Sequence, residues 1–270
     1  MKRIGLIAGQ GDLPIIWAQR ARQRGYQIYL FLIGEEKINL FDNYVKETFR
    51  INLGAWEQLV ELLKKNQIPE VIMLGKVNKN HLLNNFEPDR AMQKIMAGLP
   101  NFGNQNILQA VVKQLEDEGV QVLKQSTFLE DMLAQSGLLI PKYSGRLSLK
   151  KIKVDMKYGL EIARQIARID IGQTVIVKNK IILAIEAVEG TNATIRRGAK
   201  LGGSGVIMVK VSEPEHDFRF DIPTVGLETI EQLKSVKACG LAIEAGKVLV
   251  INKQEFLQQA NDADIAVMAF

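Results

Sequence analysis

The sequence predicts a two-domain α/β protein, in which a doubly wound parallel sheet comes first and a distinct α+β domain follows. The first half alternates apolar runs with amphipathic helical patterns, which is typical of repeated βα units. The second half instead mixes strand–turn–strand patterns with helices. Proline and glycine within residues 139–145 indicate a linker between the two patterns. We therefore expect domains at residues 1–133 and 134–270, both of ordinary domain length.

The first strand is the clearest element of the first half. Residues 3–8 form a continuous apolar run that ends at Gly9, as expected for a strand buried on both faces. A helix follows at 14–24, with Pro14 in its first turn and Gly25 at its end. The same reasoning predicts strands at 26–33, 71–74 and 119–123 and helices at 56–66, 89–97 and 105–118. Because strands and helices alternate, the strands should run parallel in one sheet.

The second half carries a different pattern. Two pairs of apolar runs are each separated by a short polar turn, which predicts strand–turn–strand units. The pairs are 173–177 with 181–187, around Asn179-Lys180, and 241–244 with 248–251, around Gly246-Lys247. Helical patterns occupy 153–169, 191–199, 227–238 and 254–261. We therefore expect an α+β domain that differs in kind from the first.

Charge and composition narrow the range of partners. The chain has 35 Lys and Arg against 30 Asp and Glu, a net charge of +5. This mild basic excess suits a phosphorylated substrate or an anionic lipid surface as well as nucleic acid. Only 6% of residues are aromatic, and no basic stretch is interleaved with aromatics as base stacking would need. We therefore do not expect a nucleic-acid partner.

Cysteine and histidine are scarce. Cys239 is the single cysteine, so no intramolecular disulfide can form and a reducing compartment is expected. With only His81 and His216 beside it, a Cys/His zinc site and a Ser–His–Asp triad are both disfavoured. The N-terminal apolar run is too short for a signal peptide, and no stretch approaches the roughly 20 residues of a membrane span. These features predict a soluble, cytoplasmic protein.

The turn after the first strand is a candidate binding loop. Gly9, Gly11, Asp12, Leu13 and Pro14 lie where the strand passes into the first helix. Glycines let a phosphate or sugar approach the backbone, and a helix N-terminus favours an anion. The pattern falls short of a dinucleotide fingerprint, because Pro14 replaces its last glycine. A tight turn that needs glycine is the structural alternative, but ligands gather at the carboxyl ends of such strands, so we predict substrate binding here.

A second loop should open on the same edge of the sheet. Gly75 and Lys76 follow the strand at 71–74, and Lys76 is placed to meet a phosphate as a point charge. A solvated lysine on a loop is an equally ordinary interpretation.

The segment that begins at Glu186 combines groups that bind metals and phosphates. A predicted strand delivers Glu186, Glu189 lies at the turn, and Thr191 is a good N-cap for the next helix. Arg196 and Arg197 follow within the same dozen residues, where they would stabilise charge that develops on phosphates. A capped helix with two solvated arginines is the structural alternative.

The segment around Asp217 gives the sharpest local pattern. As a strand it places Asp217, Arg219 and Asp221 on one face, with Phe218 and Phe220 on the other. Such an arrangement would hold a carboxylate pair rigidly enough to bind a metal. A solvent-facing strand edge, where mixed charges are common, is the structural alternative.

The candidate metal ligands Asp221, Asp217 and Glu189 are all oxygen donors, which suit a hard cation such as Mg²⁺ or Mn²⁺.

Five motifs, taken together, resemble the LpxI family. They are G-L-I-A-G-x-G-x-L-P at 5–14, L-G-K-V at 74–77, I-G-Q-x-V at 171–175, E-G-T-x-A at 189–193 and F-D-I-P-T-V-G at 220–226. One alone would be weak, but five in this order are specific and span essentially the whole chain. The resemblance implies hydrolysis of the diphosphate of UDP-2,3-diacylglucosamine to UMP and 2,3-diacylglucosamine 1-phosphate (lipid X) in lipid A biosynthesis. It also implies a Mg²⁺ requirement, a Rossmann-like N-terminal domain and a substrate cleft between the domains.

The resemblance further implies roles for single residues. Asp221, or failing it Asp217, matches the catalytic acid-rich motif of the family. Thr191 and Asn192 fall in the E-G-T motif and are expected to contact substrate. Asn192 departs from the pattern, because similar proteins are expected to carry aspartate there, and this shifts the expected metal ligands to Glu189 and Asp221.

Two other functions stay open. A nucleotide-cofactor oxidoreductase would explain the N-terminal sheet, although Pro14 and the lack of a clear ribose-binding acid oppose it; Glu35 is the candidate acid. A non-catalytic nucleotide-sugar binding protein would keep the cleft without needing Asp217 and Asp221. As partners we expect the nucleotide sugar, a second copy in a homodimer, and peripheral contact with the inner membrane surface.

Overall fold

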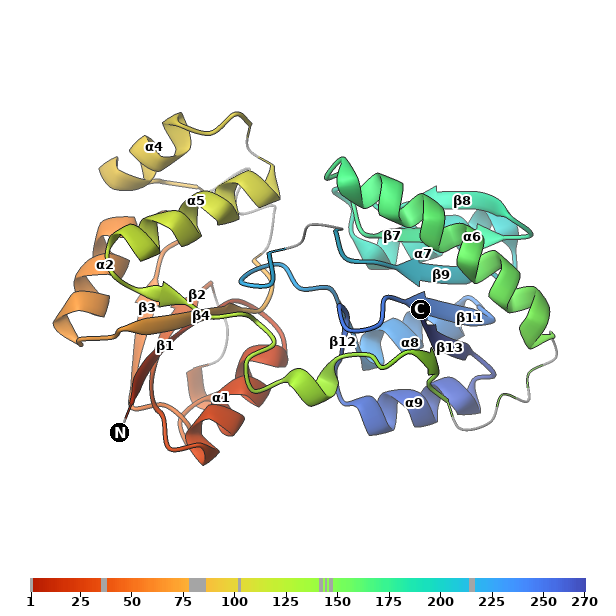
Figure 1. The fold of residues 1–270 in the computed structure, drawn as a ribbon, viewed down its shortest axis with the longest axis horizontal. Coiled ribbons are helices and arrows are strands. Elements are labelled where there is room, and N and C mark those ends of the chain that lie inside the picture. The colour runs from red at the N-terminus through yellow and green to blue at the C-terminus, as the bar shows by residue number, and fades with distance from the viewer. Residues whose placement is uncertain are drawn as a thin grey trace. The chain divides into compact units, whose positions relative to one another are not determined.

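The computed structural model describes most of the chain and divides it into two compact units (Figure 1). The described residues are 2–34, 38–77, 86–101, 103–140, 143, 145, 148–213 and 217–270. One unit comprises Met1–Leu129 with Asp217–Asp221, and the other comprises Glu130–His216 with Ile222–Phe270. The predicted α/β architecture, with a parallel sheet and a second sheet of another kind, is confirmed. The first unit also takes in a short segment from the second half of the sequence.

A five-stranded parallel sheet forms the middle of the first unit, in the order β3-β2-β1-β4-β5. The strands are β1 (Arg3–Ala8), β2 (Gln27–Ile33), β3 (Glu47–Ile51), β4 (Glu70–Leu74) and β5 (Gln121–Val122). The helices are α1 (Leu13–Gln23), α2 (Trp56–Lys65), α4 (Arg90–Ala97) and α5 (Asn104–Asp117), with a 3-10 turn at Ile38–Leu40. All the helices and strands predicted for this half are present. β3 is additional: as a partly buried edge strand it lacks the long apolar run of the others.

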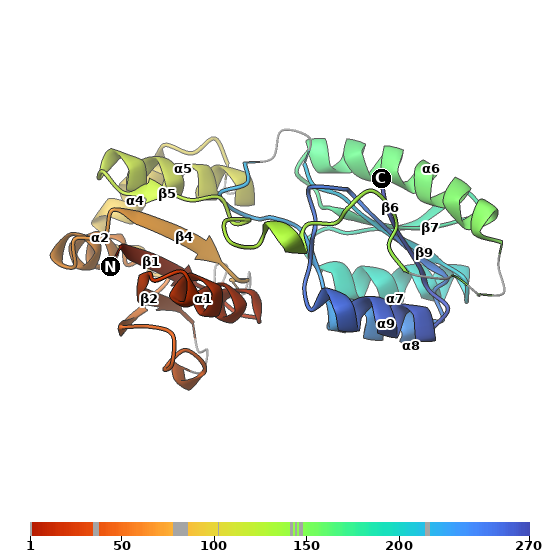
Figure 2. The same cartoon turned by 60° about the horizontal axis from the view of Figure 1, so that its bottom comes forward.

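Side-chain alternation explains how helices cover both faces of this sheet (Figure 2). Tyr29, Phe31 and Met73 share one face and pack in a core with α2, α4 and α5. α1 lies on the other face, where Trp17 is fully buried and its Nε1 donates to the Thr127 carbonyl at 2.9 Å. A strand that helices cover on both faces needs apolar side chains at nearly every position. Strands of this kind were therefore recognisable in the sequence as continuous apolar runs.

Residues 217–221 do not form the predicted strand. They form a turn, and they pack with the first unit rather than the second. Phe220 is 1% exposed and belongs to the core of the first unit. The N–H of Gln125 donates to the Phe218 carbonyl at 2.7 Å. The alternation of acidic and aromatic residues therefore reflects a docked turn with a buried ring, not a strand.

A six-stranded mixed sheet forms the middle of the second unit, in the order β6-β13-β11-β9-β7-β8. Its strands are β6 (Gly137–Leu138), β7 (Thr174–Lys178), β8 (Ile181–Ile185), β9 (Ile207–Lys210), β11 (Gly240–Ile243) and β13 (Ala266–Ala269). A separate parallel pair joins β10 (Thr224–Val225) to β12 (Leu249–Val250). The helices are α6 (Leu149–Arg168), α7 (Thr191–Gly202), α8 (Leu227–Ser235) and α9 (Lys253–Asp262), with a 3-10 turn at Glu130–Met132. β9, β11 and β13 are parallel to one another, whereas β7 runs antiparallel to β9 and β8.

The four helices predicted for this half are confirmed, and they cover both faces of the sheet. α6 packs on one face, and α7, α8 and α9 pack on the other (Figure 2). The hairpin predicted around Asn179 is confirmed as β7 and β8. The hairpin predicted around Gly246 is wrong, because β11 pairs with β9 and β13 while β12 pairs with β10. Pairing with strands that are distant in sequence determines the structure here, although the Gly246-Lys247 turn favours a hairpin.

α6, the longest of the described helices, has one buried side and one exposed side, as is typical of a helix at the protein surface. Ile152, Met156 and Leu160 recur every four residues and are buried against the sheet. The opposite side carries most of the helix's lysines and arginines. Across the described residues, no helix combines the length and apolar character needed to cross a membrane.

Candidate functional site

Two loops of the first unit, both predicted to bind substrate, lie side by side. The N–H of Gly9 donates to the Leu74 carbonyl at 2.8 Å. Gln10 and Lys76 exchange backbone hydrogen bonds of 2.8 and 2.9 Å, which makes an isolated antiparallel bridge. Because β1 and β4 are parallel neighbours, both loops line the carboxyl edge of the sheet, where ligands of such sheets bind.

Glycine makes this close approach possible. A Cβ atom on Gly9 would lie 2.5 Å from the Lys76 carbonyl oxygen, and one on Gly75 would lie 2.7 Å from the carbonyl carbon of Gly9. Gly11 has a φ of +104°, which other residues rarely adopt. The backbone alone therefore requires these glycines, whether or not a ligand binds beside them.

Exposure separates the residues of these loops that can meet a ligand from those that cannot. Leu13 and Pro14 are buried, and they anchor the start of α1. Asp12, at the N-cap of α1, is exposed, and so are Gly11 and Lys76. The helix start and the Lys76 ammonium both favour a negatively charged group. The accessible part of the predicted site is therefore Gly11, Asp12 and the Gly75-Lys76 loop.

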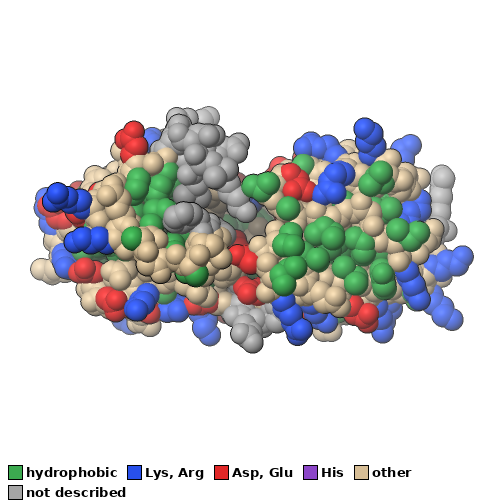
Figure 3. All heavy atoms as spheres, turned by 90° about the horizontal axis from the view of Figure 1, so that it is seen from above, with side chains coloured by type: hydrophobic (Ala, Val, Ile, Leu, Met, Phe, Trp, Pro, Cys, Tyr) green, Lys and Arg blue, Asp and Glu red, His purple; other side chains and the backbone are tan. Residues whose placement is uncertain are grey.

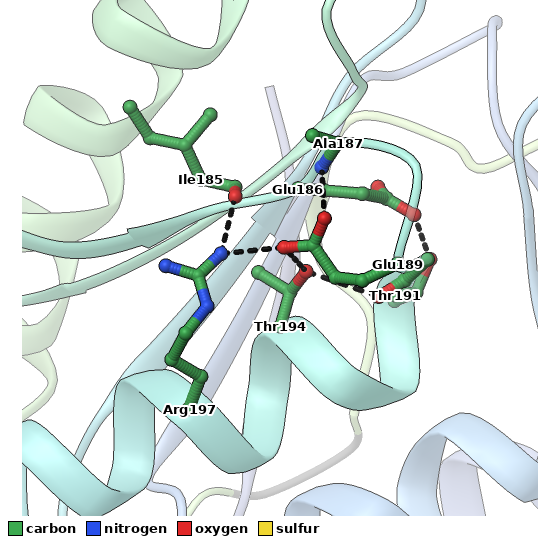
Figure 4. A network of polar contacts seen from close by, with 8 residues as sticks. Ile185, Glu186, Ala187, Glu189, Thr191, Thr194 and Arg197 are labelled. Carbon is green, nitrogen blue, oxygen red and sulfur yellow. Dashed lines mark hydrogen bonds and ion pairs between the residues drawn. The ribbon is translucent and has the colours of Figure 1, made fainter.

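In the second unit, Glu189 is the centre of a hydrogen-bonded network at the start of α7 (Figure 4). Arg197 donates to Glu189 Oε1 at 2.5 Å and to the Ile185 carbonyl at 2.7 Å. The Ala187 N–H donates to Oε2 at 3.1 Å, and the Thr194 hydroxyl lies 3.3 Å from Oε1. A hydrogen bond from its own backbone, and then the bond from Arg197, hold the pKa of Glu189 below its ordinary value, against the opposing effect of burial.

These contacts argue against the metal role predicted for Glu189. Both carboxylate oxygens already accept hydrogen bonds from the protein, so a cation would have to displace the Arg197 guanidinium. No group of three or more His, Cys, Asp or Glu side chains within the described ranges could hold a metal ion. Asp221, the other expected ligand, is an exposed residue, and Mg²⁺ is commonly held by one or two carboxylates together with substrate phosphates.

The two arginines predicted to bind phosphate differ in their surroundings. Arg196 lines a shallow depression with Lys237, whereas Arg197 is bonded to Glu189. Asn192 Nδ2 donates to Glu228 Oε1 on α8 at 2.6 Å. An aspartate at position 192 would face Glu228 with a second negative charge, so the asparagine has a local structural reason. Three side chains considered in the sequence, Glu35, His81 and His216, lie outside the described residues.

The carboxyl edge of the second sheet holds buried charges that were not predicted from the sequence. Lys210 ends β9 and is 9% exposed, and its Nζ donates to Thr191 Oγ1 at 3.1 Å. Thr191 Oγ1 in turn donates to Glu186 Oε1 at 2.7 Å. Glu244 follows β11 and is 3% exposed, and it accepts from Arg164 Nε at 2.7 Å. The sequence feature that could have revealed these residues is a charged residue at the end of an apolar strand, because ligands bind where parallel strands end.

One arginine holds the 217–221 turn in place. Arg219 donates to both carboxylate oxygens of Asp217, at 2.6 to 3.0 Å, and to Glu116 Oε1 on α5 at 2.6 Å. The hydrogen bond with Asp217 is the main cause that raises the pKa of Arg219, which therefore stays charged. Asp221 is exposed at the end of the turn, with a φ of +51° that aspartate tolerates better than most residues. Asp217 and Arg219 together thus hold the turn that carries Asp221.

Comparison with known proteins agrees with the motifs in the sequence. A model of the LpxI N-terminal domain matches residues 3–132, and a model of the LpxI C-terminal domain matches residues 142–268. UDP-2,3-diacylglucosamine pyrophosphatase LpxI of Caulobacter vibrioides is 27% identical, over 99% of this chain and 97% of its own. Among solved structures, N5-carboxyaminoimidazole synthetase from Staphylococcus aureus matches 74% of this chain and 44% of its own, with 12% identity and a TM-score of 0.27. Because the two family models match both halves, the chain belongs to the LpxI family.

Proposed function

We propose that this protein hydrolyses the diphosphate of UDP-2,3-diacylglucosamine to UMP and 2,3-diacylglucosamine 1-phosphate in lipid A biosynthesis. The proposal rests on two sequence matches. Both halves of the chain match models of one family, and nearly the full length of the chain aligns with a protein named as a pyrophosphatase. Hydrolysis of a diphosphate depends on neutralising charge and positioning water, with little covalent chemistry. The exposed loops around Gly11 and Lys76, together with the Asp221 carboxylate, supply charged and hydrogen-bonding groups for both tasks.

The loops at the carboxyl edge of the first sheet suit the nucleotide half of this substrate. Lys76 would neutralise a phosphate as a point charge, and the backbone at Gly11 permits close approach. Asp12 offers an exposed acceptor for a ribose hydroxyl. The reciprocal bonds between Gln10 and Lys76 would fix the two loops relative to each other.

We also propose that Asp221 is the catalytic carboxylate and a ligand of Mg²⁺. Phe220, buried directly before it, and Arg219 anchor the turn that presents Asp221. A bound Mg²⁺ would neutralise charge on the phosphate oxygens. Mn²⁺ should substitute for Mg²⁺, whereas Zn²⁺ should have no structural role.

Release of UMP from UDP-2,3-diacylglucosamine tests this proposal. We expect hydrolysis with Mg²⁺ and none after exhaustive chelation, while circular dichroism shows an intact fold. Asp221→Asn keeps the backbone tolerance of the residue and removes its charge, so turnover should fall at least ~10²-fold while the protein remains folded. Asp264→Asn is the matched control, because Asp264 is also exposed and has a φ of +55°. Normal UMP release by Asp221→Asn would exclude the assignment.

Peripheral membrane contact is a further part of the proposal, because the substrate carries two acyl chains. Figure 3 shows hydrophobic side chains gathered on one face of the second unit, with Lys and Arg beside them. α6 contains six basic and two acidic residues, and so carries most of the chain's net charge of +5. We expect vesicles that contain anionic lipid to retain the protein better than neutral vesicles, and a protein found in the cytoplasm apart from this contact. We also propose a homodimer, which light scattering would test.

A further inference from the structure

Unsatisfied polar atoms gather at one place in the second unit. Within the described residues, three buried side-chain atoms have no hydrogen-bond partner: Thr174 Oγ1, Glu186 Oε2 and Ser212 Oγ. Buried polar groups are nearly always paired, because an unmade hydrogen bond leaves the cost of desolvation uncompensated. All three belong to the carboxyl edge of the six-stranded sheet, which indicates that this edge is built for a partner.

Backbone contacts hold the three residues together. Thr174 is the register partner of Lys210 across β7 and β9. The N–H of Glu186 donates to the Thr174 carbonyl at 2.8 Å. Ser212 follows two residues after Lys210, and its N–H donates to Glu244 Oε2 at 2.9 Å. The three unpaired atoms therefore come from adjacent backbone segments.

Thr174, Glu186 and Lys210 lie on the α7 side of the sheet. Along β7, Ile176 packs in the core that includes α7, so Thr174, two residues earlier, faces the same side. Lys210 is on this side too, since its Nζ contacts Thr191 in the first turn of α7. Thr174 is fully buried, whereas Thr191 and Glu186 are half-buried. The cluster therefore begins directly beneath the surface, at the start of α7.

The charges of the cluster select a neutral ligand. The Glu186 carboxylate already lies at the start of α7, bonded to Thr191, and it would repel a phosphate from that position. The Lys210 ammonium, bonded to the same hydroxyl, would repel a divalent cation. The unpaired atoms comprise one carboxylate oxygen that accepts and two hydroxyls that donate or accept. Such a set matches the hydroxyl groups of a sugar ring.

We propose that this edge binds the sugar ring of a nucleotide sugar, with Glu186 Oε2 accepting from a ring hydroxyl and Thr174 completing the contacts. The inference rests on the proposed function for the identity of the sugar, an acylated glucosamine that keeps free hydroxyls. The unpaired atoms themselves do not depend on that function. These residues bind the substrate and take no part in the bond that is broken.

The stability of the empty protein gives the first test. Thr174→Val removes the unpaired hydroxyl and keeps the shape of the side chain, so Tm should stay unchanged or rise. Thr194→Val is the matched control: Thr194 is equally buried, but its hydroxyl donates to the Gly190 carbonyl at 3.0 Å, so Tm should fall. If both variants lower Tm alike, the Thr174 hydroxyl has an internal role and the site is refuted.

Binding gives the second test, by saturation-transfer NMR with UDP-N-acetylglucosamine as the probe and UMP and inorganic phosphate as comparisons. Thr174→Val and Glu186→Gln should weaken the signals of the sugar-ring protons while the uridine signals persist. In the hydrolysis assay, Thr174→Val should raise KM about fivefold and leave kcat unchanged. The reason is that the variant loses one neutral hydrogen bond equally in the bound substrate and in the transition state. Thr194→Val should leave both constants unchanged.

The outcomes separate the sugar site from the proposed hydrolysis. Sugar signals that are unchanged in both variants, or displaced by inorganic phosphate alone, would overturn the site. If the wild type releases no UMP but its sugar signals depend on Thr174, the site stands and the proposed hydrolysis falls. If UMP is released and KM ignores Thr174, the hydrolysis stands and the site falls.

Discussion

Two acidic segments, 186–197 and 217–221, were expected to share one chemistry, but they are built differently. In the first, the exposed Glu189 accepts hydrogen bonds from its own turn and helix, the one from the helix being donated by Arg197. The second packs on the other half of the sequence: Arg219 reaches Glu116, 103 positions away. The comparison shows that an acid close to an arginine in sequence is not yet a site. The hydrogen bonds of its carboxylate decide whether it can still bind a ligand.

Among the substitutions that test this comparison, loss of the buried Phe220 ring should have the largest effect on the free energy of unfolding. Phe220→Ala deletes a side chain that is 1% exposed, and we expect the first unit to lose about 3–5 kcal/mol of unfolding free energy. Hydrogen exchange should then speed up in peptides of the first unit. Phe256→Ala, in the core of the second unit, is the matched control and should give the reverse pattern. Equal loss of protection in both units after Phe220→Ala would contradict the docking of this segment.

Arg219 should matter less than the ring it accompanies. Arg219→Gln removes the guanidinium bonds to Asp217 and Glu116, and because these side chains are partly exposed we expect a loss of about 1–2 kcal/mol in urea unfolding. Lys64→Gln breaks a single ion pair with Glu118 and serves as control, with an expected change below about 0.5 kcal/mol. Indistinguishable unfolding curves for the two variants would mean that Arg219 does not hold the turn.

In the first segment, loss of Arg197 should cost still less, because only one carboxylate loses a guanidinium partner and it keeps its other hydrogen bonds. We expect Arg197→Gln to lower the unfolding free energy by about 1 kcal/mol. The adjacent Arg196→Gln is the control and should have no measurable effect, since Arg196 is exposed at a shallow depression. A larger loss for position 196 than for position 197 would show that the network around Glu189 is misassigned.

The smallest effect is expected from Glu189→Gln, and it should depend on pH. The pKa of Glu189 is lowered on folding, so its ionised form adds stability above the ordinary value of 4.5, and this is lost as the pH falls through the folded pKa. Urea unfolding of wild type and variant should therefore differ slightly near neutral pH and converge in acid. A difference that widens as the pH falls would contradict the lowered pKa.

Most elements of the fold could be predicted from the sequence, because their burial is repeated along the chain. The run at 3–8 is apolar since helices cover both faces of β1, and the four-residue spacing of Ile152, Met156 and Leu160 marks the buried side of α6. The β1 and β4 loops could likewise be placed at one edge, because parallel neighbours end together.

The parts that escaped prediction depend on contacts with distant residues. The alternation around Phe220 has the period of a strand, but one ring is buried in the first unit and Arg219 turns back to Asp217. The runs on either side of Gly246 resemble a hairpin but join different sheets. Lys210 looks like an exposed lysine at a strand end until its partner Thr191 is known. In each case the deciding partner is not a neighbour in sequence.

The place of Phe220 in the core of the first unit also affects how the chain is synthesised. Residues 1–129 emerge from the ribosome about 90 residues before Phe220 does. At roughly 5–20 residues per second, translation leaves that core without one of its side chains for about 5–20 s. Most of the second unit is made during this interval. A translational pause before codon 220 would therefore lengthen the time during which the nascent first unit is open to proteases and chaperones, whereas the same pause after residue 221 has left the ribosome would not.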